Sequence, residues 1–181
     1  MIKVKTTRFG DLEIADKDML TLPQGLVGFP ELKRYVLLDH DKESPFKWLQ
    51  SLDDGEIAFV LINPLMFKPD YTVEVAEGEV SDLELTNEED AVISVIVTMP
   101  NNPQNMTANL KAPLIFNLKN RHGKKIILNN SLYTTRHNIM EEMKKHTASV
   151  KSQEVKDAIE HVKEKIRQDT AKKKPGMSSS G

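Results

Sequence analysis

Short apolar runs separated by turn residues dominate the first 133 residues of the chain. Within these runs apolar and polar residues alternate or form brief unbroken apolar stretches, and Gly, Pro, Asn or Asp bounds most of them. This pattern predicts strands over Ile2–Phe9, Asp11–Ile14, Arg34–Asp39, Glu56–Ile62, Thr72–Val75, Ala91–Met99, Ala108–Leu118 and Lys124–Leu128. The run over 91–99 is apolar almost throughout, which indicates a strand buried on both faces.

So many strands with few helical patterns between them favour a mainly β fold. Hairpin turns are expected at Phe9-Gly10-Asp11 and at Arg121-His122-Gly123-Lys124. One short internal helix is expected where Ser81 is followed three residues later by Glu84, because this pair matches a capping box. We therefore predict a small antiparallel β-barrel-like domain with a short internal helix and C-terminal helices.

After Tyr133 the apolar spacing becomes helical. Ile139, Met140 and Met143 predict a helix over about 136–146 that covers one side of the barrel. The predicted organisation is a barrel domain over 1–147, an amphipathic helical extension over 148–170 and a disordered tail over 171–181. The tail is expected to be disordered because it is too poor in apolar residues to build a core.

The predicted extension carries one apolar stripe on an otherwise charged helix from about Ser152 to Gln168. The stripe residues follow one another at intervals of 4, 3 and 4, and they are Val155, Ile159, Val162 and Ile166. Two interpretations stay open. Either the helix docks on its own barrel, or it binds a partner or a second copy of the chain.

Composition narrows the class of protein. The chain has 181 residues, no Cys and a formal net charge of -2. The lack of Cys excludes disulfides, thiol catalysis and thiolate metal sites. No stretch approaches the roughly 18 consecutive apolar residues of a membrane-spanning helix, and the N-terminus does not match a signal peptide. We therefore expect a cytoplasmic protein without a membrane partner.

The charge is distributed unevenly. Residues 1–149 carry 17 basic and 22 acidic side chains, whereas residues 150–181 carry 8 basic and 5 acidic ones. The segment Pro69–Leu110 has no Lys or Arg, and its acids are Asp70, Glu74, Glu77, Glu79, Asp82, Glu84, Glu88, Glu89 and Asp90. Such a segment repels phosphate backbones, so direct nucleic-acid binding by the barrel is disfavoured and a basic protein partner is favoured. The alternative is a hydrated acidic face without a partner.

Motifs for chemistry are absent from the sequence. The five His residues do not form an HExxH motif, and there is no GxGxxG, GxxxxGK[ST] or GxSxG sequence. His40 lies between Asp39 and Asp41, but a solvated histidine at a strand end explains it better than a tuned base does. We predict no catalytic residue, no metal site and no cofactor.

Two apolar segments are ambiguous between core and interface. Phe46, Trp48 and Gln50 lie in one turn-bounded segment, 44–51. The second segment is Pro64–Tyr71, whose two prolines forbid a continuous central strand and predict a protruding apolar loop beside the acidic segment. Large aromatic side chains are enriched both in cores and at interface hot spots, so the two interpretations stay open for both segments.

At these residues the chain resembles the flagellar assembly factor FliW family, over about 1–145. The resemblance rests on motifs in order, which are Leu22–Pro30, Pro45–Ser51, Ile57–Pro64 running into Pro69-Asp70-Tyr71, Asn109–Asn117, and Lys125–Leu128 with Tyr133. The sequence departs from the family at Lys125, where members often have Gln. The predicted helical extension lies outside the resemblance.

The resemblance implies a β-barrel-like protein without catalysis that binds flagellin in the cytoplasm. It also implies that the protein binds the RNA-binding translational regulator CsrA in competition with flagellin, antagonises it and so controls flagellin synthesis. We expect a monomer without direct nucleic-acid contact. The candidate partner-binding residues are Phe46, Trp48, Gln50, Met66, Phe67, Asp70, Tyr71, Glu74, Glu77, Glu79 and Asn117. A nucleic-acid-binding barrel and a small-molecule-binding enzyme are the alternatives.

Overall fold

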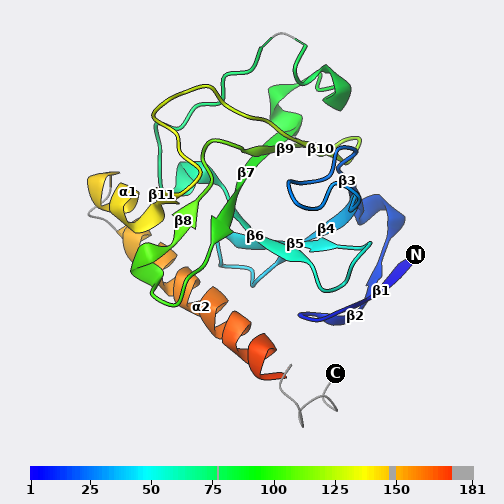
Figure 1. Cartoon of the computed structure of the whole chain (residues 1–181), viewed down its shortest axis with the longest axis horizontal. Coiled ribbons are helices and arrows are strands. Elements are labelled where there is room, and N and C mark those ends of the chain that lie inside the picture. The colour runs from blue at the N-terminus through cyan, green and yellow to red at the C-terminus, as the bar shows by residue number, and fades with distance from the viewer. Residues whose placement is uncertain (77, 147–149, 173–181) are drawn as a thin grey trace.

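The computed structural model describes residues 1–76, 78–146 and 150–172 of the chain. Its strands are β1 (Ile2–Thr6), β2 (Gly10–Ile14), β3 (Leu20–Thr21), β4 (Arg34–Asp39), β5 (Phe46–Ser51), β6 (Ala58–Ile62), β7 (Ala91–Thr98), β8 (Thr107–Ala108), β9 (Leu114–Asn117), β10 (His122–Lys125) and β11 (His137–Asn138). Short 3-10 turns are η1 (Asp16–Asp18), η2 (Pro64–Met66), η3 (Ser81–Leu83), η4 (Glu88–Asp90) and η5 (Pro103–Asn105). The α-helices are α1 (Ile139–His146) and α2 (Val150–Lys172) (Figure 1).

Seven strands close into a barrel. Their order is β7-β6-β5-β4-β3-β10-β9, and β9 pairs back with β7. Closure depends on β7, whose residues Ala91–Ser94 pair with β9 while Val95–Val97 pair with β6. All pairings in the ring are antiparallel except the contact between β10 and β3. The mainly β, barrel-like prediction is confirmed.

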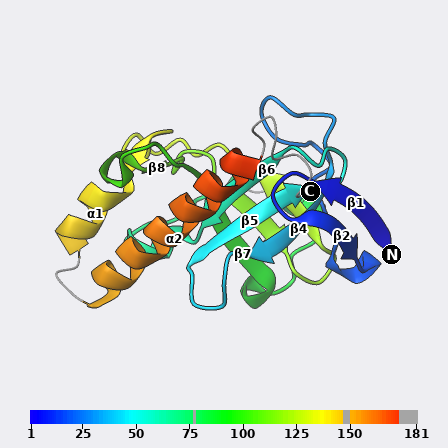
Figure 2. The same ribbon diagram turned by 90° about the horizontal axis from the view of Figure 1, so that it is seen from below.

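Alternating side chains of the barrel strands belong to two different apolar clusters. Leu49 of β5 and Leu61 of β6 join a cluster with Leu20, Tyr35 and Phe116, which come from strands around the ring, so this cluster fills the barrel. Their neighbours in the same two strands, including Phe46, Trp48, Val60 and Ile62, face the opposite way and join the larger cluster. Both helices cover that larger cluster, and Figure 2 shows α2 lying across the outside of the barrel near β5.

Several predicted element boundaries are wrong. No strand forms at 72–75, and the predicted strand 108–118 is divided into β8 and β9 by a turn that contains Pro113. β1 ends at Thr6 instead of Phe9. The last hairpin turn ends at Arg121, whose φ is +63°, so His122–Lys125 form the strand β10 and not the turn.

The internal helix is a single 3-10 turn, η3, and not a capped α-helix. The Ser81 hydroxyl donates to the Gly78 carbonyl at 2.8 Å instead of accepting at a helix N-terminus. Glu84 adopts φ +53° and ends the turn, so the Ser81–Glu84 pair does not form the predicted capping box.

Both predicted C-terminal helices form, but α1 begins at Ile139 and not near residue 136, because His137 and Asn138 pair with β8 as strand β11. Ile139, Met140 and Met143 of α1 are buried in the larger cluster, which confirms that this helix covers the barrel. In α2, three residues of the predicted stripe, Val155, Ile159 and Val162, are buried in the same cluster. The helix therefore docks on its own barrel. Residues 173–181 of the expected tail lie outside the described residues.

Candidate protein-binding surface

A groove of about 470 Å³ opens between the acidic segment and the chain that follows β10. Its lining residues are Thr72, Glu74, Val75, Ala76, Glu79, Ile127, Leu128, Asn129 and Asn130, and we call it the acidic groove. One wall is the segment 72–75, which was predicted as a strand but forms no regular secondary structure. The groove thus lies beside acids that the sequence singled out.

The second wall alternates between buried and exposed side chains. Ile126 and Leu128 are buried, and their backbone N–H groups donate to the carbonyls of Pro113 and Lys111 at 2.9 and 2.8 Å. Ile127 lies between them and exposes 52% of its surface. Because consecutive residues of an extended chain point to opposite sides, Ile127 presents an apolar side chain to the groove. Sequence reasoning missed this wall, because Ile126-Ile127-Leu128 read as one apolar run.

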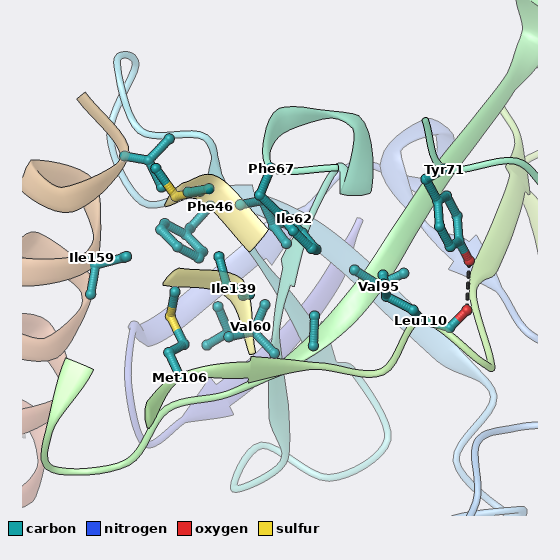
Figure 3. Close-up of a cluster of buried hydrophobic side chains, with 14 of the residues drawn as sticks. Phe46, Val60, Ile62, Phe67, Tyr71, Val95, Met106, Leu110, Ile139 and Ile159 are labelled. Carbon is teal, nitrogen blue, oxygen red and sulfur yellow. Dashed lines mark hydrogen bonds between the residues drawn. The ribbon is translucent and has the colours of Figure 1, made fainter. Parts of the chain in front are cut away.

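Two tyrosines in ring contact hold the start of the acidic wall in place. The rings of Tyr71 and Tyr133 lie 4.7 Å apart, and the Tyr133 hydroxyl accepts a hydrogen bond from the Thr72 backbone N–H at 2.9 Å. The Tyr71 hydroxyl donates to the Leu110 carbonyl at 2.7 Å (Figure 3). Burial, reinforced by Tyr133, raises the pKa of Tyr71 above its usual value. Tyr71 is therefore a buried support of the groove.

The predicted acids differ in their surroundings. Glu74 lines the groove and is exposed. Glu79 is half-buried, and its carboxylate accepts a hydrogen bond from the Ala76 N–H at 3.0 Å. Glu77 lies outside the described residues. Lys124 donates to the Glu79 carbonyl at 2.6 Å and pairs with Asp82 at 3.2 Å, so Glu74 is the described rim acid most open to a partner.

The three candidates on β5 are buried: Phe46 exposes 0%, Trp48 2% and Gln50 0% of its surface. The Gln50 amide nitrogen donates to the carbonyls of Ser51, Gly55 and Ile57 at 2.9, 3.3 and 3.1 Å. Gln50 therefore holds the turn between β5 and β6. All three side chains are covered by other parts of the chain and are not available to a partner.

Asn117 is also buried, and its side chain forms hydrogen bonds to backbone groups of neighbouring segments. Its amide nitrogen donates to the carbonyls of Leu83 at 2.8 Å and Glu84 at 3.4 Å, and its amide oxygen accepts from the Lys119 N–H at 2.9 Å. These bonds attach η3 to β9. Asn117 exposes only 3% of its surface and is not available to a partner.

The predicted loop Pro64–Tyr71 is divided between core and surface. Phe67 is buried, whereas Met66 exposes 41% and its neighbour Leu65 52% of their surfaces. Asp70 is exposed and pairs with Lys68 at 3.1 Å. Of the candidates in this loop, Met66 and Asp70 are therefore accessible.

A buried carboxylate links this loop to α1, and sequence reasoning missed it. Glu142 exposes 3% of its surface, and its oxygens lie 2.6 Å from His137 Nε2 and 2.5 Å from His146 Nε2. The Lys68 ammonium lies 3.6 Å from the same carboxylate and also pairs with Asp70. The i, i+4 spacing of Glu142 and His146 is the sequence signal, but it does not show that Lys68 faces them.

The charges around Glu142 set its ionisation. Burial raises the pKa of Glu142, but the hydrogen bond from His137, the charge of Lys68 and the hydrogen bond from His146 outweigh it. The net pKa of Glu142 lies below its usual value, so the ionised form is stabilised. The hydrogen bond and charge of Lys68 also lower the pKa of Asp70.

Two sets of side chains within the described residues have the composition of a metal site. They are His40 with Asp41 and His161, and Asp70 with Glu142 and His146, each with its donor atoms within 4.8 Å of one another. In the second set the Lys68 ammonium already provides the cation for both carboxylates. The first set is open to solvent at Asp41 and His161, which lie 3.5 Å apart and connect the turn after β4 to α2.

Comparisons with known proteins agree on one family. The model of the FliW protein family matches residues 3–139. The flagellar assembly factor FliW of Alkaliphilus metalliredigens is 41% identical over 143 residues, which cover 78% of this chain and 88% of that protein. The FliW of Thermoanaerobacter pseudethanolicus is also 41% identical, over 79% of this chain and 96% of that protein. A crystal structure of the flagellar assembly factor FliW aligns with a TM-score of 0.70 at 39% identity and covers 76% of this chain and 96% of that one.

The fold and the acidic groove together define the structural class of this protein. The molecule is a small closed β-barrel whose outer apolar layer is covered by helices and whose surface carries an acid-lined groove. The chain belongs to the FliW family of flagellar assembly factors. The matched relatives are named as assembly factors and not as enzymes. Among the described residues, no helix combines the length and the apolar content needed to cross a membrane.

Proposed function

We propose that this protein binds flagellin in the cytoplasm and, in competition with flagellin, binds and antagonises CsrA. Free flagellin occupies the protein and leaves CsrA able to repress flagellin translation. When flagellin is exported, the released protein sequesters CsrA. The protein acts as a monomer, without catalysis, a cofactor or direct contact with nucleic acid.

The observation that carries this proposal, together with the family membership, is the acidic groove. Glu74 and Glu79 line it, and no Lys or Arg occurs anywhere in residues 69–110. CsrA must carry positive charge to hold RNA, so an acidic surface attracts it and steers its approach. Val75 and Ile127 expose apolar side chains at the same groove, which supply contact area beside the charge.

The accessible candidates define the interface that we propose. Glu74 and Glu79 belong to the groove, and Met66 and Asp70 lie on the loop that precedes its acidic wall. Phe46, Trp48, Gln50, Phe67, Tyr71 and Asn117 act indirectly, because they hold the barrel and the groove in shape.

The test is titration calorimetry of the purified protein with CsrA for the wild type, Glu74→Lys and Glu31→Lys. Glu31 is an exposed acid outside the groove, so the control carries the same change of charge. We expect Glu74→Lys to weaken CsrA binding about tenfold or more, because it places a cation opposite a basic partner. Equal affinities for Glu74→Lys and Glu31→Lys would exclude the groove as the CsrA site.

A further inference from the structure

The turn after β4 and helix α2 bring two histidines and a carboxylate together. His40 and Asp41 follow β4 directly, whereas His161 lies on α2. Each of the three residues offers one donor atom, and these atoms lie within 4.8 Å of one another. The rings of His40 and His161 meet at 80° with their centres 6.4 Å apart, so they do not stack on each other. Two imidazole nitrogens and one carboxylate oxygen therefore face one small volume at the surface.

The spacing of these donor atoms fits a transition-metal ion. Ligands about 2.0–2.1 Å from a tetrahedral zinc ion lie roughly 3.3 Å from one another. Asp41 Oδ2 and His161 Nδ1 are 3.5 Å apart, which is longer than an ordinary hydrogen bond and close to that ligand separation. Donor atoms at the 4.8 Å limit of the set need to approach by only about 1.5 Å, which rotations of surface side chains provide.

Asp41 is held in the orientation that a metal ligand needs. Its Oδ1 accepts hydrogen bonds from the backbone N–H groups of Glu43 and Ser44 at 2.9 and 2.8 Å. The other oxygen, Oδ2, is the one that faces His161. Hydrogen bonds to one oxygen of a carboxylate fix the direction of the other, and metal-binding carboxylates are commonly positioned in this way.

The charges around the set favour a cation. A pocket of about 820 Å³ adjoins it, and the lining residues are Asp41, Lys42, Glu43, Ser44, Asp157, Ala158 and His161. Three of these residues are acidic and one is basic. Lys42 is exposed, and the nearby Lys165 ammonium lies over the Phe9 ring, 5.5 Å from its centre. In the set formed by Asp70, Glu142 and His146, by contrast, the Lys68 ammonium already pairs with both carboxylates.

We propose that His40, Asp41 and His161 bind a divalent transition-metal ion such as Zn²⁺, and that this ion clamps α2 to the turn after β4. Imidazole nitrogens favour Zn²⁺ over Mg²⁺ and Ca²⁺, which prefer sites built from oxygen atoms. Water takes the remaining coordination position, beside Asp157, which precedes His161 by about one helical turn and lines the same pocket. The ion has a structural role, so the inference does not depend on flagellin or CsrA binding.

This site departs from the sequence-based prediction of no metal site. That prediction considered motifs whose ligands lie close together in the sequence, whereas this set joins the end of β4 to α2. The family model ends at residue 139, so His161 lies beyond the matched region. Undocking of α2 separates His161 from the other two ligands. An ion that binds only the docked form therefore shifts the equilibrium toward docking.

Titration calorimetry of the full chain, without an affinity tag, with ZnCl2 tests the site. We expect one ion per chain in the wild type and at least tenfold weaker binding in His161→Ala. His122→Ala is the matched control, because it removes a histidine of β10 that lies outside the set. This variant should bind Zn²⁺ as the wild type does. Because the chain has no Cys, thiolates do not contribute to the signal.

Co²⁺ identifies the ligands by a second route. Co²⁺ in a tetrahedral protein site absorbs visible light far more strongly than hydrated Co²⁺, so the spectrum reports coordination directly. We expect a strong visible band in the wild type and in His122→Ala, and its loss in His40→Ala. Asp41→Asn keeps an oxygen for the backbone N–H groups of the turn and removes the charge, and it should also lose the band.

Hydrogen exchange tests whether the ion clamps the helix. With free Zn²⁺ at about ten times its dissociation constant, opening of α2 should become about tenfold rarer, and the amides of the helix should exchange about tenfold more slowly. In His161→Ala, Zn²⁺ should leave the exchange of α2 unchanged.

Equal Zn²⁺ affinities of the wild type and His161→Ala would overturn the site, because the ion would then be held elsewhere. No heat of Zn²⁺ binding in the wild type would overturn it as well. Zn²⁺ binding that leaves hydrogen exchange of α2 unchanged in the wild type would overturn the clamp.

Discussion

The buried Glu142 carboxylate provides the sharpest test of how α1 is held on the barrel. Glu142→Gln keeps the size of the side chain and removes its charge, while His137, His146 and Lys68 remain around it. Hydrogen bonds to a charged group contribute about 1.5–3 kcal/mol each, and breaking a buried ion pair from one side costs about 3–5 kcal/mol. The amide retains one acceptor oxygen, so we expect a loss of roughly 2–4 kcal/mol in the free energy of unfolding.

The assay is urea unfolding followed by circular dichroism, with thermal unfolding beside it. For a domain of this size the expected loss corresponds to a decrease of roughly 5–15 °C in Tm. Glu141→Gln is the matched control, because Glu141 is the preceding residue of α1 and is exposed. It should change the free energy of unfolding by less than about 1 kcal/mol.

The pH dependence gives a second readout. Because the folded-state pKa of Glu142 lies below its usual value, its contribution is complete above the unfolded-state pKa and is lost as the pH falls through the folded-state pKa. The stability difference between wild type and Glu142→Gln should be largest above about pH 5 and decrease below about pH 4. Equal stabilities of the Glu141→Gln and Glu142→Gln variants at neutral pH would refute this account of the cluster.

Three further predictions concern the barrel and the groove. Phe46→Ala should cost about 3–5 kcal/mol by leaving a cavity, and circular dichroism beside a pull-down should show binding lost only together with the fold. Gly55→Ala should detach the β1–β2 hairpin, because the Cβ of the new alanine would overlap the Lys5 carbonyl oxygen. Proteolysis near residue 7 should then increase, and unchanged proteolysis would contradict this prediction. Glu74→Gln should slow CsrA association at low salt and reduce its salt dependence in a stopped-flow series, and parallel salt curves for wild type and variant would exclude steering by this acid.

The residue pattern of a segment predicted a strand correctly only where the fold also supplies that segment with a neighbouring strand. The segment Arg34–Asp39 is a short apolar run between two charged residues, and it forms β4 with the predicted bounds. The segment Thr72–Val75 alternates polar and apolar residues, as a strand would, but it lies beside the groove without a strand partner, and a strand requires one. The residues of one segment do not show which other segments lie beside it in the folded chain.

The candidate site residues show the same division. Phe46 and Trp48 have the residue types of an interface hot spot, but those types are equally typical of a core, and only the packing of the outer layer shows that they are buried. Asn117 donates to the carbonyl of Leu83, 34 positions away, a contact that no local pattern predicts. The acidic segment was recognisable because charge depends on composition, whereas the opposing wall at Ile127 depends on how the barrel closes.

Competition between the two partners is the central claim, and one calorimetric series tests it directly. The purified protein is titrated with CsrA, then with flagellin, and then with CsrA in the presence of saturating flagellin. The account predicts binding to each partner alone and loss of the CsrA signal when flagellin is present. An unchanged CsrA signal beside saturating flagellin would contradict it.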